Sequence, residues 1–387
     1  MHSTARLLLC SFSFFFLTTA AMAADALGFT TSLFNGKNLD GWIVTGCEAV
    51  VENGQLLLKS GNGFVRSELR YRDFVLELDW RAQKKDAWDS GIYFRAEEPP
   101  QGRPWPTRYQ ANLKQGQEGD VGGLKGATGG SKLTKPAEWN HFKLTAVGRT
   151  ASLEVNGKPA WKVDGLEAAD GYIGLQAEVP LGGEFEFRNV KITELDYKSL
   201  FNGKDVTGWE GGGDDAAKCW AVEEGLLMCT GKKGPWLRSK EQHDDFNLRF
   251  QYKLATGGNS GVYVRVPSGG AHRGAEADEK EAGTEIQLLD DTAKQYAKLQ
   301  PYQYCGSVYA IAPATKHVNR PVGTWNTMEI NCAGNHYRIT HNGVVIVDAA
   351  EKDFPELKNR LPKGFLGLQN HSTQVWFRDL RIGPAVR

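Results

Sequence analysis

One sequence module is written twice along the chain, and this repeat limits the fold more than any other feature. A series of blocks recurs in the same order, beginning with Leu33–Trp42, which returns as Leu200–Trp209. The series closes with Phe187–Ile192, which returns as Phe377–Ile382. In a chain of 387 residues, this repeat predicts two domains of one fold rather than a single large core. We expect the first domain over residues 30–196 and the second over 199–384.

Within each copy the hydrophobic pattern is typical of β-strands. Residues alternate between apolar and polar along Phe74–Trp80 and along its counterpart in the second copy. An Asn-Gly pair at Asn156 and again at Asn342 is a hairpin signal. The only helical expectation is a short helix over residues 290–298. The pattern therefore predicts an all-β chain of two β-sandwiches.

The first residues read as a secretory signal rather than as part of a domain. Arg6 precedes the apolar run Leu7–Leu17, and Ala21-Met22-Ala23 has the small-x-small pattern of a signal peptidase site. We expect residues 1–23 to be a cleaved signal peptide and the protein to be secreted or periplasmic. No later segment is long enough to span a bilayer.

Charge and cysteine content exclude some classes of partner and site. Lys plus Arg and Asp plus Glu both number 46, so nothing favours nucleic acid or an anionic membrane surface. No Cys/His cluster has zinc spacing. Five cysteines remain after the signal peptide, and an odd number leaves at least one unpaired within the chain. Cys219 and Cys229 are positioned to bridge neighbouring strands.

Polar side chains gather on two predicted strands of the second copy, Asn259–Arg265 and Thr284–Asp290. Alternation places Glu285 beside Gln287 on one strand face and puts Tyr263 and Arg265 together on the other strand. Such a face suits a polar, ring-shaped ligand such as a sugar. A solvated strand face carrying an ion pair explains the same pattern equally well.

The repeated blocks resemble the 3-keto-disaccharide hydrolase domain family. The shared motifs are Leu-Phe-Asn-Gly-Lys…Gly-Trp, Asn-Ser-Gly-Val-Tyr-Val-Arg, Glu-Ile-Gln-Leu-Leu-Asp, Leu-Gln-Asn-His and Phe-Arg-Asp-Leu-Arg-Ile. The resemblance covers nearly the whole mature chain, twice. It implies two concanavalin A-like jelly rolls, each with two antiparallel sheets. It also implies cleavage of glycosides that carry a ketone at sugar carbon 3, by elimination of the aglycone followed by hydration.

The two copies do not match the family equally. By sequence spacing Gln287 aligns with Gln110 and Glu285 with Arg108, while Glu178 replaces His371. We therefore expect the second copy to be catalytic and the first to be a degenerate partner or a carbohydrate-binding module. A non-catalytic, lectin-like protein is the competing hypothesis for the whole chain, because jelly rolls host both activities.

The chemistry implied by the resemblance needs a base for the carbon 2 proton, an acid for the departing oxygen and a group that stabilises the enolate. We assign the base to His371, the acid to Glu285 (or the base, with a pKa raised by burial), and the polarising group to Arg265 or a divalent metal ion. The residues expected to hold hydroxyl groups are Asn259, Tyr263, Gln287 and Gln369.

Each assignment has a structural alternative. His371 could cap a turn, Glu285 and Arg265 could form an ion pair, and Asp290 could cap the short helix instead of binding a metal. His272 and three other histidines show no ligand spacing and receive no role.

Overall fold

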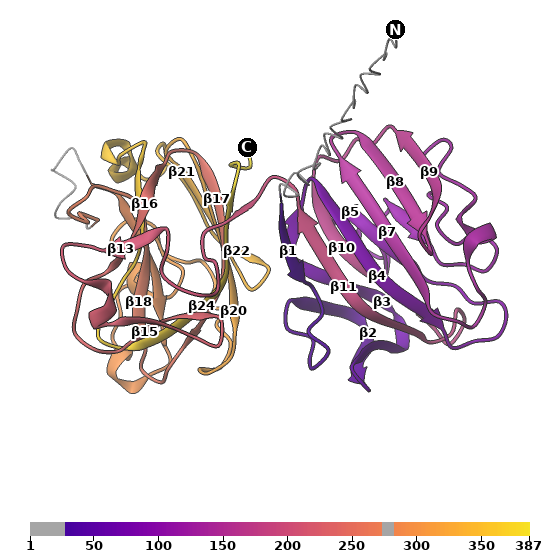
Figure 1. Cartoon of the computed structure of the whole chain (residues 1–387), viewed down its shortest axis with the longest axis horizontal. Helices are drawn as coiled ribbons and strands as arrows, with labels where there is room; N and C mark the ends of the chain where they lie inside the picture. Colours follow the sequence, from indigo (N-terminus) through magenta and orange to yellow (C-terminus); the bar gives the residue numbers. More distant parts are fainter. Residues whose placement is uncertain (1–27, 273–281) are drawn as a thin grey trace, which may run out of the picture.

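The chain forms two β-sandwich domains joined by a short linker (Figure 1). The computed structural model describes residues 28–272 and 282–387. The predicted signal peptide lies outside these ranges. They contain no α-helix, and hence no described helix has the length and apolarity needed to cross a bilayer. The expected helix over 290–298 is reduced to the 3-10 turn Lys294–Tyr296.

The first domain consists of antiparallel strands and one described 3-10 helix. Its elements are β1 (Phe29–Ser32), β2 (Trp42–Glu52), β3 (Gln55–Tyr71), β4 (Phe74–Ala82), β5 (Gly91–Ala96), β6 (Gln110–Asn112), η1 (Gly130–Leu133), β7 (Asn140–Val147), β8 (Thr150–Val155), β9 (Lys158–Asp164), β10 (Gly171–Val179) and β11 (Phe185–Glu194).

The second domain repeats this order of strands. Its elements are β12 (Lys198–Ser199), β13 (Trp209–Gly211), η2 (Ala216–Lys218), β14 (Trp220–Glu223), β15 (Leu226–Thr230), β16 (Leu237–His243), β17 (Phe246–Leu254), β18 (Asn259–Val266), β19 (Thr284–Leu289), η4 (Lys294–Tyr296), η5 (Pro301–Gln303), β20 (Asn326–Ala333), β21 (His336–His341), β22 (Val344–Ala350), η6 (Pro355–Asn359), β23 (Gly364–Leu368) and β24 (Gln374–Gly383).

Strand alternation builds a separate hydrophobic core in each domain. On β4 the buried residues are Phe74, Leu76, Leu78, Trp80 and Ala82, with half-buried residues between them, and the first four lie in the stretch whose alternation the sequence showed. The equivalent strand β17 belongs to the other core. Each core lies between the two layers of its own domain, so the two copies fold around independent interiors.

The two domains differ in how their sheets connect. In the first domain β3 runs through both layers, so its strands form one continuous 11-stranded sheet. Gly63 permits the bend, because a Cβ there would lie 2.2 Å from the carbonyl oxygen of Thr45. In the second domain the same stretch is broken between β15 and β16 around Pro235, which leaves an eight-stranded and a five-stranded sheet. The five-stranded sheet, in the order β13-β16-β23-β18-β19, carries the site described below.

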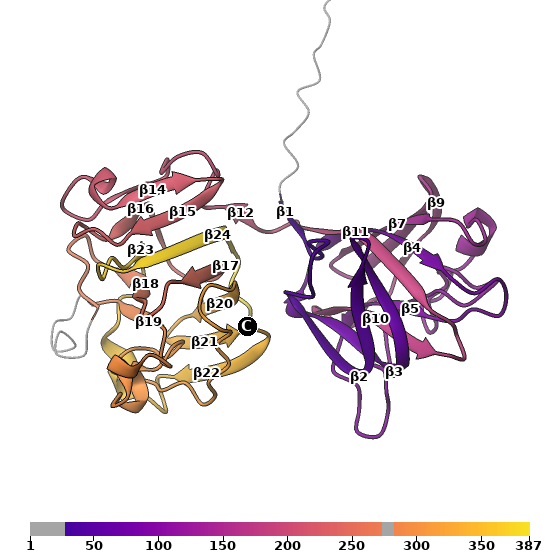
Figure 2. The same ribbon diagram turned by 90° about the horizontal axis from the view of Figure 1, so that it is seen from below.

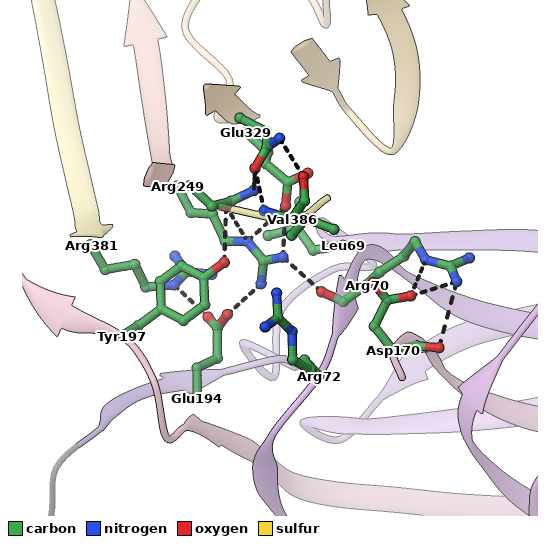
Figure 3. Close-up of polar contacts among 12 residues, drawn as sticks. Leu69, Arg70, Arg72, Asp170, Glu194, Tyr197, Arg249, Glu329, Arg381 and Val386 are labelled. Atoms are coloured by element: carbon green, nitrogen blue, oxygen red, sulfur yellow. Dashed lines mark hydrogen bonds and ion pairs between the residues drawn. The ribbon is translucent and has the colours of Figure 1, made fainter. Parts of the chain in front are cut away.

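A buried charge network joins the domains (Figure 3). Glu194 at the end of β11 accepts hydrogen bonds from Arg249 of β17 and Arg381 of β24, and all three side chains are at most 5% exposed. Arg249 also pairs with Glu329 at 2.7 Å and donates to the carbonyl oxygen of Arg70, 2.8 Å away in the first domain. Two guanidinium groups thus balance two carboxylates in a site that is largely shielded from solvent.

A second buried ion pair crosses the same junction. Arg320 of the second domain donates to Glu68 of β3, whose side chain is 3% exposed. Close packing supports this contact, because a Cβ on Gly343 would lie 2.8 Å from Ile43. Figure 2 shows the second domain beside the β2–β3 side of the first. The linker is therefore not the only connection between the two copies.

Candidate functional site

The outer face of the five-stranded sheet carries a row of polar side chains. On β19, Ile286 and Leu288 point into the core, so Glu285 and Gln287 point to the opposite face. Strand pairing places Tyr263 of β18 opposite Glu285, and Gly261 opposite Gln287. The alternation read from the sequence therefore puts these side chains on one surface.

A cavity of ≈ 180 Å³ opens on this face. Five of its lining residues were predicted from the sequence, namely Asn259, Glu285, Gln287, Gln369 and His371. The other five come from β19 and the segment that follows it, namely Leu289, Tyr296, Leu299, Gln303 and Tyr309. A larger groove of ≈ 770 Å³ lies beside the linker, but none of the predicted site residues lines it.

Glu285 lies at the floor of the cavity and is 2% exposed. Its Oε1 accepts a hydrogen bond of 2.8 Å from Nε2 of Gln369. Its Oε2 lies 3.3 Å from Nε2 of His272, a residue that sequence reasoning left without a role. His272 precedes β19 in a connecting segment and has no motif or spacing that would have identified it.

Amide and hydroxyl groups surround the carboxylate. Gln287 donates from Nε2 to Oδ1 of Asn259 at 3.1 Å. Gln303 donates to the hydroxyl of Tyr309 at 3.1 Å, which leaves the proton of that hydroxyl for another acceptor. His371 is exposed and lines the same cavity, in the loop that follows β23 and begins with Gln369. The cavity thus combines one buried carboxylate, one exposed imidazole and several neutral hydrogen-bonding groups.

Tyr263 does not line the cavity. Its ring is 6% exposed and lies under the imidazole of His272, with 4.0 Å between ring centroids and an interplanar angle of 22°. The ring of Trp236 covers another side at 5.4 Å. In this arrangement Tyr263 supports His272 and has no open face for a ligand.

The proposed role of Arg265 in polarising a ketone is wrong. The backbone of Arg265 adopts φ 51 at a register shift between Tyr263 and Val266, and this irregularity turns its side chain away from the cavity. The guanidinium is fully buried, donates to the carbonyl oxygens of Asp244 and Gly334 at 2.6 Å, and pairs with Asp245 at 3.0 Å.

The first domain shows what Arg265 does instead. Arg95, with φ 44, donates in the same way to the carbonyl oxygens of Arg72 and Gly148 and pairs with Asp73 at 2.9 Å. A contact made identically in both copies ties loops together in the shared fold. Arg265 is therefore a structural residue.

The interpretations of Asp290 as a helix cap or a metal ligand are not supported by its contacts. Its Oδ2 accepts the backbone N–H of Gly257 at 2.8 Å, and its Oδ1 accepts from the hydroxyl of Thr292 at 2.7 Å. Within residues 28–272 and 282–387, no group of three or more His, Cys, Asp or Glu side chains is placed to hold a metal ion. The five cysteines of these ranges are free thiols, so no Cys219–Cys229 disulfide is present there.

Strand pairing corrects the sequence alignment of the two copies. Gln110 pairs with Tyr93, as Glu285 pairs with Tyr263, so Gln110 and not Arg108 is the counterpart of Glu285. Arg108 is exposed and bonds to Glu167 at 2.6 Å. Gln110 donates to Gln176, which occupies the position of Gln369. The first copy has thus exchanged the carboxylate for an amide at an otherwise retained position.

The rest of the first-domain face also differs. Phe64, Tyr93 and Ala96 form a small buried cluster, with Trp105 packed against them. Glu178 stands in place of His371, and its pKa is raised by burial and by the nearby charge of Asp89. The pair of Glu285 and His371 in the second domain therefore has no equivalent pair here.

Comparison with known proteins supports a carbohydrate-active enzyme. A model of the 3-keto-alpha-glucoside-1,2-lyase-like domain matches residues 29–193 and again 196–383, which confirms the family predicted from the repeated blocks. A 3-keto-disaccharide hydrolase of Bacteroides thetaiotaomicron is 25% identical over 243 residues, covering 50% of this chain and 84% of that protein.

Solved structures similar to this chain each cover about half of it or less. A proposed glycosyl hydrolase from Parabacteroides distasonis is 24% identical with a TM-score of 0.42, covering 49% of this chain and 94% of its own. A beta-glucanase from Bacillus licheniformis is 15% identical with a TM-score of 0.31, covering 43% of this chain and 96% of its own. The predicted architecture of two all-β jelly-roll domains is confirmed.

Proposed function

We propose, since the chain belongs to the family of 3-keto-alpha-glucoside-1,2-lyase-like domains, that its second domain cleaves the glycosidic bond of glycosides whose sugar carries a ketone at carbon 3. The observation that carries this proposal is the buried Glu285 at the floor of a cavity that His371 also lines. The equivalent face of the first domain has Gln110 and Glu178 instead.

A ketone at carbon 3 acidifies the hydrogen on carbon 2, so cleavage can proceed by elimination. His371 takes the carbon 2 proton, and an enolate forms with a double bond between carbons 2 and 3 and the negative charge on the carbon 3 oxygen. When the ketone reforms, a double bond forms between carbons 1 and 2, the bond from carbon 1 to the aglycone oxygen breaks, and Glu285 gives that oxygen a proton. Water then adds its oxygen to carbon 1 and its proton to Glu285, and His371 returns a proton to carbon 2. The net reaction is hydrolysis.

The neutral side chains of the cavity would orient the sugar. The hydroxyl of Tyr309 takes over the role that the sequence had given to Arg265, because its proton is free to donate to the developing enolate oxygen. Asn259, Gln287 and Gln369 would bind ring hydroxyls. The cavity is smaller than the ~300–1,000 Å³ typical of sites that enclose a drug-sized ligand, so we assign one sugar ring to it and leave the aglycone outside.

We also propose that the enzyme acts outside the cytoplasm, as a secreted or periplasmic protein. The apolar run Leu7–Leu17 and the following Ala21-Met22-Ala23 support this proposal. We assign no cleavage to the first domain, because its floor position holds an amide that cannot donate a proton as a carboxylic acid does.

Aglycone release from a 3-keto-glucoside and from its unoxidised parent tests the function. Each substrate is incubated with the protein, with and without a chelator. We expect release from the keto sugar only, and the chelator arm reports whether a divalent metal contributes. Release from both substrates would contradict the dependence on the ketone. Sugar binding without release from either would favour the lectin-like alternative.

A further inference from the structure

Part of the cavity wall comes from residues 303–309, called here the site segment, which lie in the connection between β19 and β20. The side chain of Tyr309 in this segment lines the cavity. The N–H of Tyr309 donates to the carbonyl oxygen of Glu285 at 2.8 Å, and the N–H of Gly306 donates to that of Gln287 at 2.7 Å. The site segment therefore runs along β19, and the placement of its side chains depends on how firmly it is held.

The far end of the same connection holds both the site segment and the end of β19. Asn319 donates from Nδ2 to the carbonyl oxygen of Leu289 at 3.2 Å and to Oδ1 of Asp291 at 2.9 Å. Oδ2 of Asp291 in turn accepts the N–H of Cys305, within the site segment, at 3.4 Å. Leu289 ends β19 and lines the cavity. Asn319 thus links two parts of the cavity wall to the next residue in the chain, Arg320.

Arg320 is held in place by the first domain. Its backbone N–H donates to Oδ1 of Asn326 at 2.9 Å, and its Nη1 donates to the carbonyl oxygen of Trp325 at 2.8 Å. Its Nη2 donates to Oε1 of Glu68, whose side chain is 3% exposed. A carboxylate this deeply buried needs its charged partner close by, because water cannot replace that partner. The ion pair therefore fixes Arg320, and with it Asn319, relative to β3 of the first domain.

The equivalent positions of the other copy do not form this ion pair. Lys135 of the first domain donates its N–H to Asn140 at 2.7 Å, in the way that Arg320 bonds to its own asparagine, but the Lys135 side chain is 62% exposed. Lys240 takes the place of Glu68 in the second domain and is exposed as well. Two lysines replace the arginine and the glutamate, so the contact belongs to the junction and not to the repeated fold.

We propose that Glu68 of the first domain is a positioning residue for the cavity of the second domain, and that it acts through Arg320 on the site segment. This inference rests on the proposed function, in which the hydroxyl of Tyr309 stabilises the developing enolate. It gives the first domain a part in the reaction although we assign no cleavage to it. The copy that lacks the floor carboxylate supports the segment that completes the cavity in the other copy.

The first test is Glu68→Gln, which keeps an acceptor oxygen for Arg320 and removes the charge. We expect kcat for a 3-keto-glucoside to fall about tenfold with KM changed less than about twofold, because displacing a group that acts in the transition state lowers kcat. Arg320→Gln removes the other partner and should have a similar effect. The double variant should lose no more than either single variant, since all three break one contact. Losses that multiply in the double variant would contradict this coupling.

Glu194→Gln is the matched control. Glu194 is another junction carboxylate with a side chain that is 3% exposed, but its partners Arg249 and Arg381 lie on β17 and β24 (Figure 3). This variant should lower the melting temperature at least as much as Glu68→Gln does, and should keep kcat within about twofold of wild type, as expected for a contact remote from the cavity. If it lowered kcat as much as Glu68→Gln, general loosening of the junction would explain both results and the proposal would be overturned.

Hydrogen exchange of the free protein separates this inference from the proposed function, because it needs no substrate. In Glu68→Gln the amides of Gly306 and Tyr309 should exchange at least about tenfold faster than in wild type, while those of β18 stay protected. In Glu194→Gln the same two amides should exchange as in wild type. If the wild-type protein cleaved no keto glycoside but exchange changed in this way, the support of the site segment by Glu68 would stand and the proposed function would fail. Unchanged exchange of both amides in Glu68→Gln would disprove that support, whatever the activity.

Discussion

The outer faces of the two domains have the same framework and different chemistry. Arg95 and Arg265 tie the same loops through the same carbonyl oxygens, and Gln115 and Asp290 accept the same turn N–H, from Ala87 and Gly257 respectively. By contrast, the position that Glu285 occupies in the second domain is occupied by Gln110 in the first. Polar residues that both copies retain at equivalent contacts maintain the fold, and the carboxylate retained in only one copy identifies the candidate active site.

The largest expected difference between the copies is catalytic. Glu285→Gln gives the second domain the side chain that the first already has, and should reduce kcat/KM for a 3-keto-glucoside with an alkyl aglycone by about 10³-fold, within the range for loss of a general acid. Gln110→Glu in the first domain should leave the rate unchanged. If Glu285→Gln released the aglycone at a rate within tenfold of wild type, the comparison of the two domains would have selected the wrong residue.

The domain junction provides the next largest contrast. Arg249 on β17 is buried against the first domain, whereas Glu77, at the equivalent position of β4, has a side chain that is 41% exposed. Arg249→Met leaves Glu194 beside only one guanidinium in a buried site, and should destabilise the protein by about 3–5 kcal/mol. Glu77→Met should change stability by less than about 0.5 kcal/mol. Urea denaturation measures the change in unfolding free energy for both variants. Equal changes in Arg249→Met and Glu77→Met would mean that the junction contributes little to stability.

Acid should weaken the second domain through a core residue that the first domain lacks. Burial, together with the charge of Arg320, lowers the pKa of His341 to about 3. The unfolded histidine has a pKa of about 6.5, so the unfolded state binds the extra proton and stability is lost as pH falls below that value. At pH 5 the loss should be about 2 kcal/mol.

His341→Gln tests this dependence because it removes the titrating ring while retaining a polar partner for Tyr252, which bonds to His341 at 3.0 Å. Its melting temperature should decline less between pH 7 and pH 5 than that of wild type. The control is His371→Gln, at an exposed position, which should follow the wild-type curve. If the melting temperature of His341→Gln declined as much as that of wild type between pH 7 and pH 5, His341 would be excluded as the source of acid sensitivity.

The smallest effect is expected at Asp290. Asp290→Asn keeps an oxygen for the N–H of Gly257, as Gln115 does for Ala87, so stability should change by less than about 1 kcal/mol. Aglycone release should stay within about twofold of wild type, as expected for a group outside the reacting site. A large loss of activity that an added divalent metal restores would instead establish Asp290 as a metal ligand.

The sequence was most informative where periodicity decides the structure. Alternation along β4 correctly indicated which side chains are buried, and alternation along β19 correctly separated the core residues Ile286 and Leu288 from Glu285 and Gln287 on the opposite face. The same reasoning failed at Arg265, because a single irregular residue with positive φ moves a side chain to another face. It also aligned Gln110 with Gln287, since spacing alone does not reveal how strands pair.

By itself, the sequence determined the duplication, the all-β domains, the family and most of the cavity's polar residues, because these depend on repeated motifs and on local strand geometry. Only the tertiary structure decided that His272 faces Glu285, that Arg249 and Glu194 are buried together, and that Gln110 is the counterpart of Glu285. Those relationships join residues brought together by strand pairing and domain packing. A pattern along the chain records the order of such residues and not the distance between their side chains.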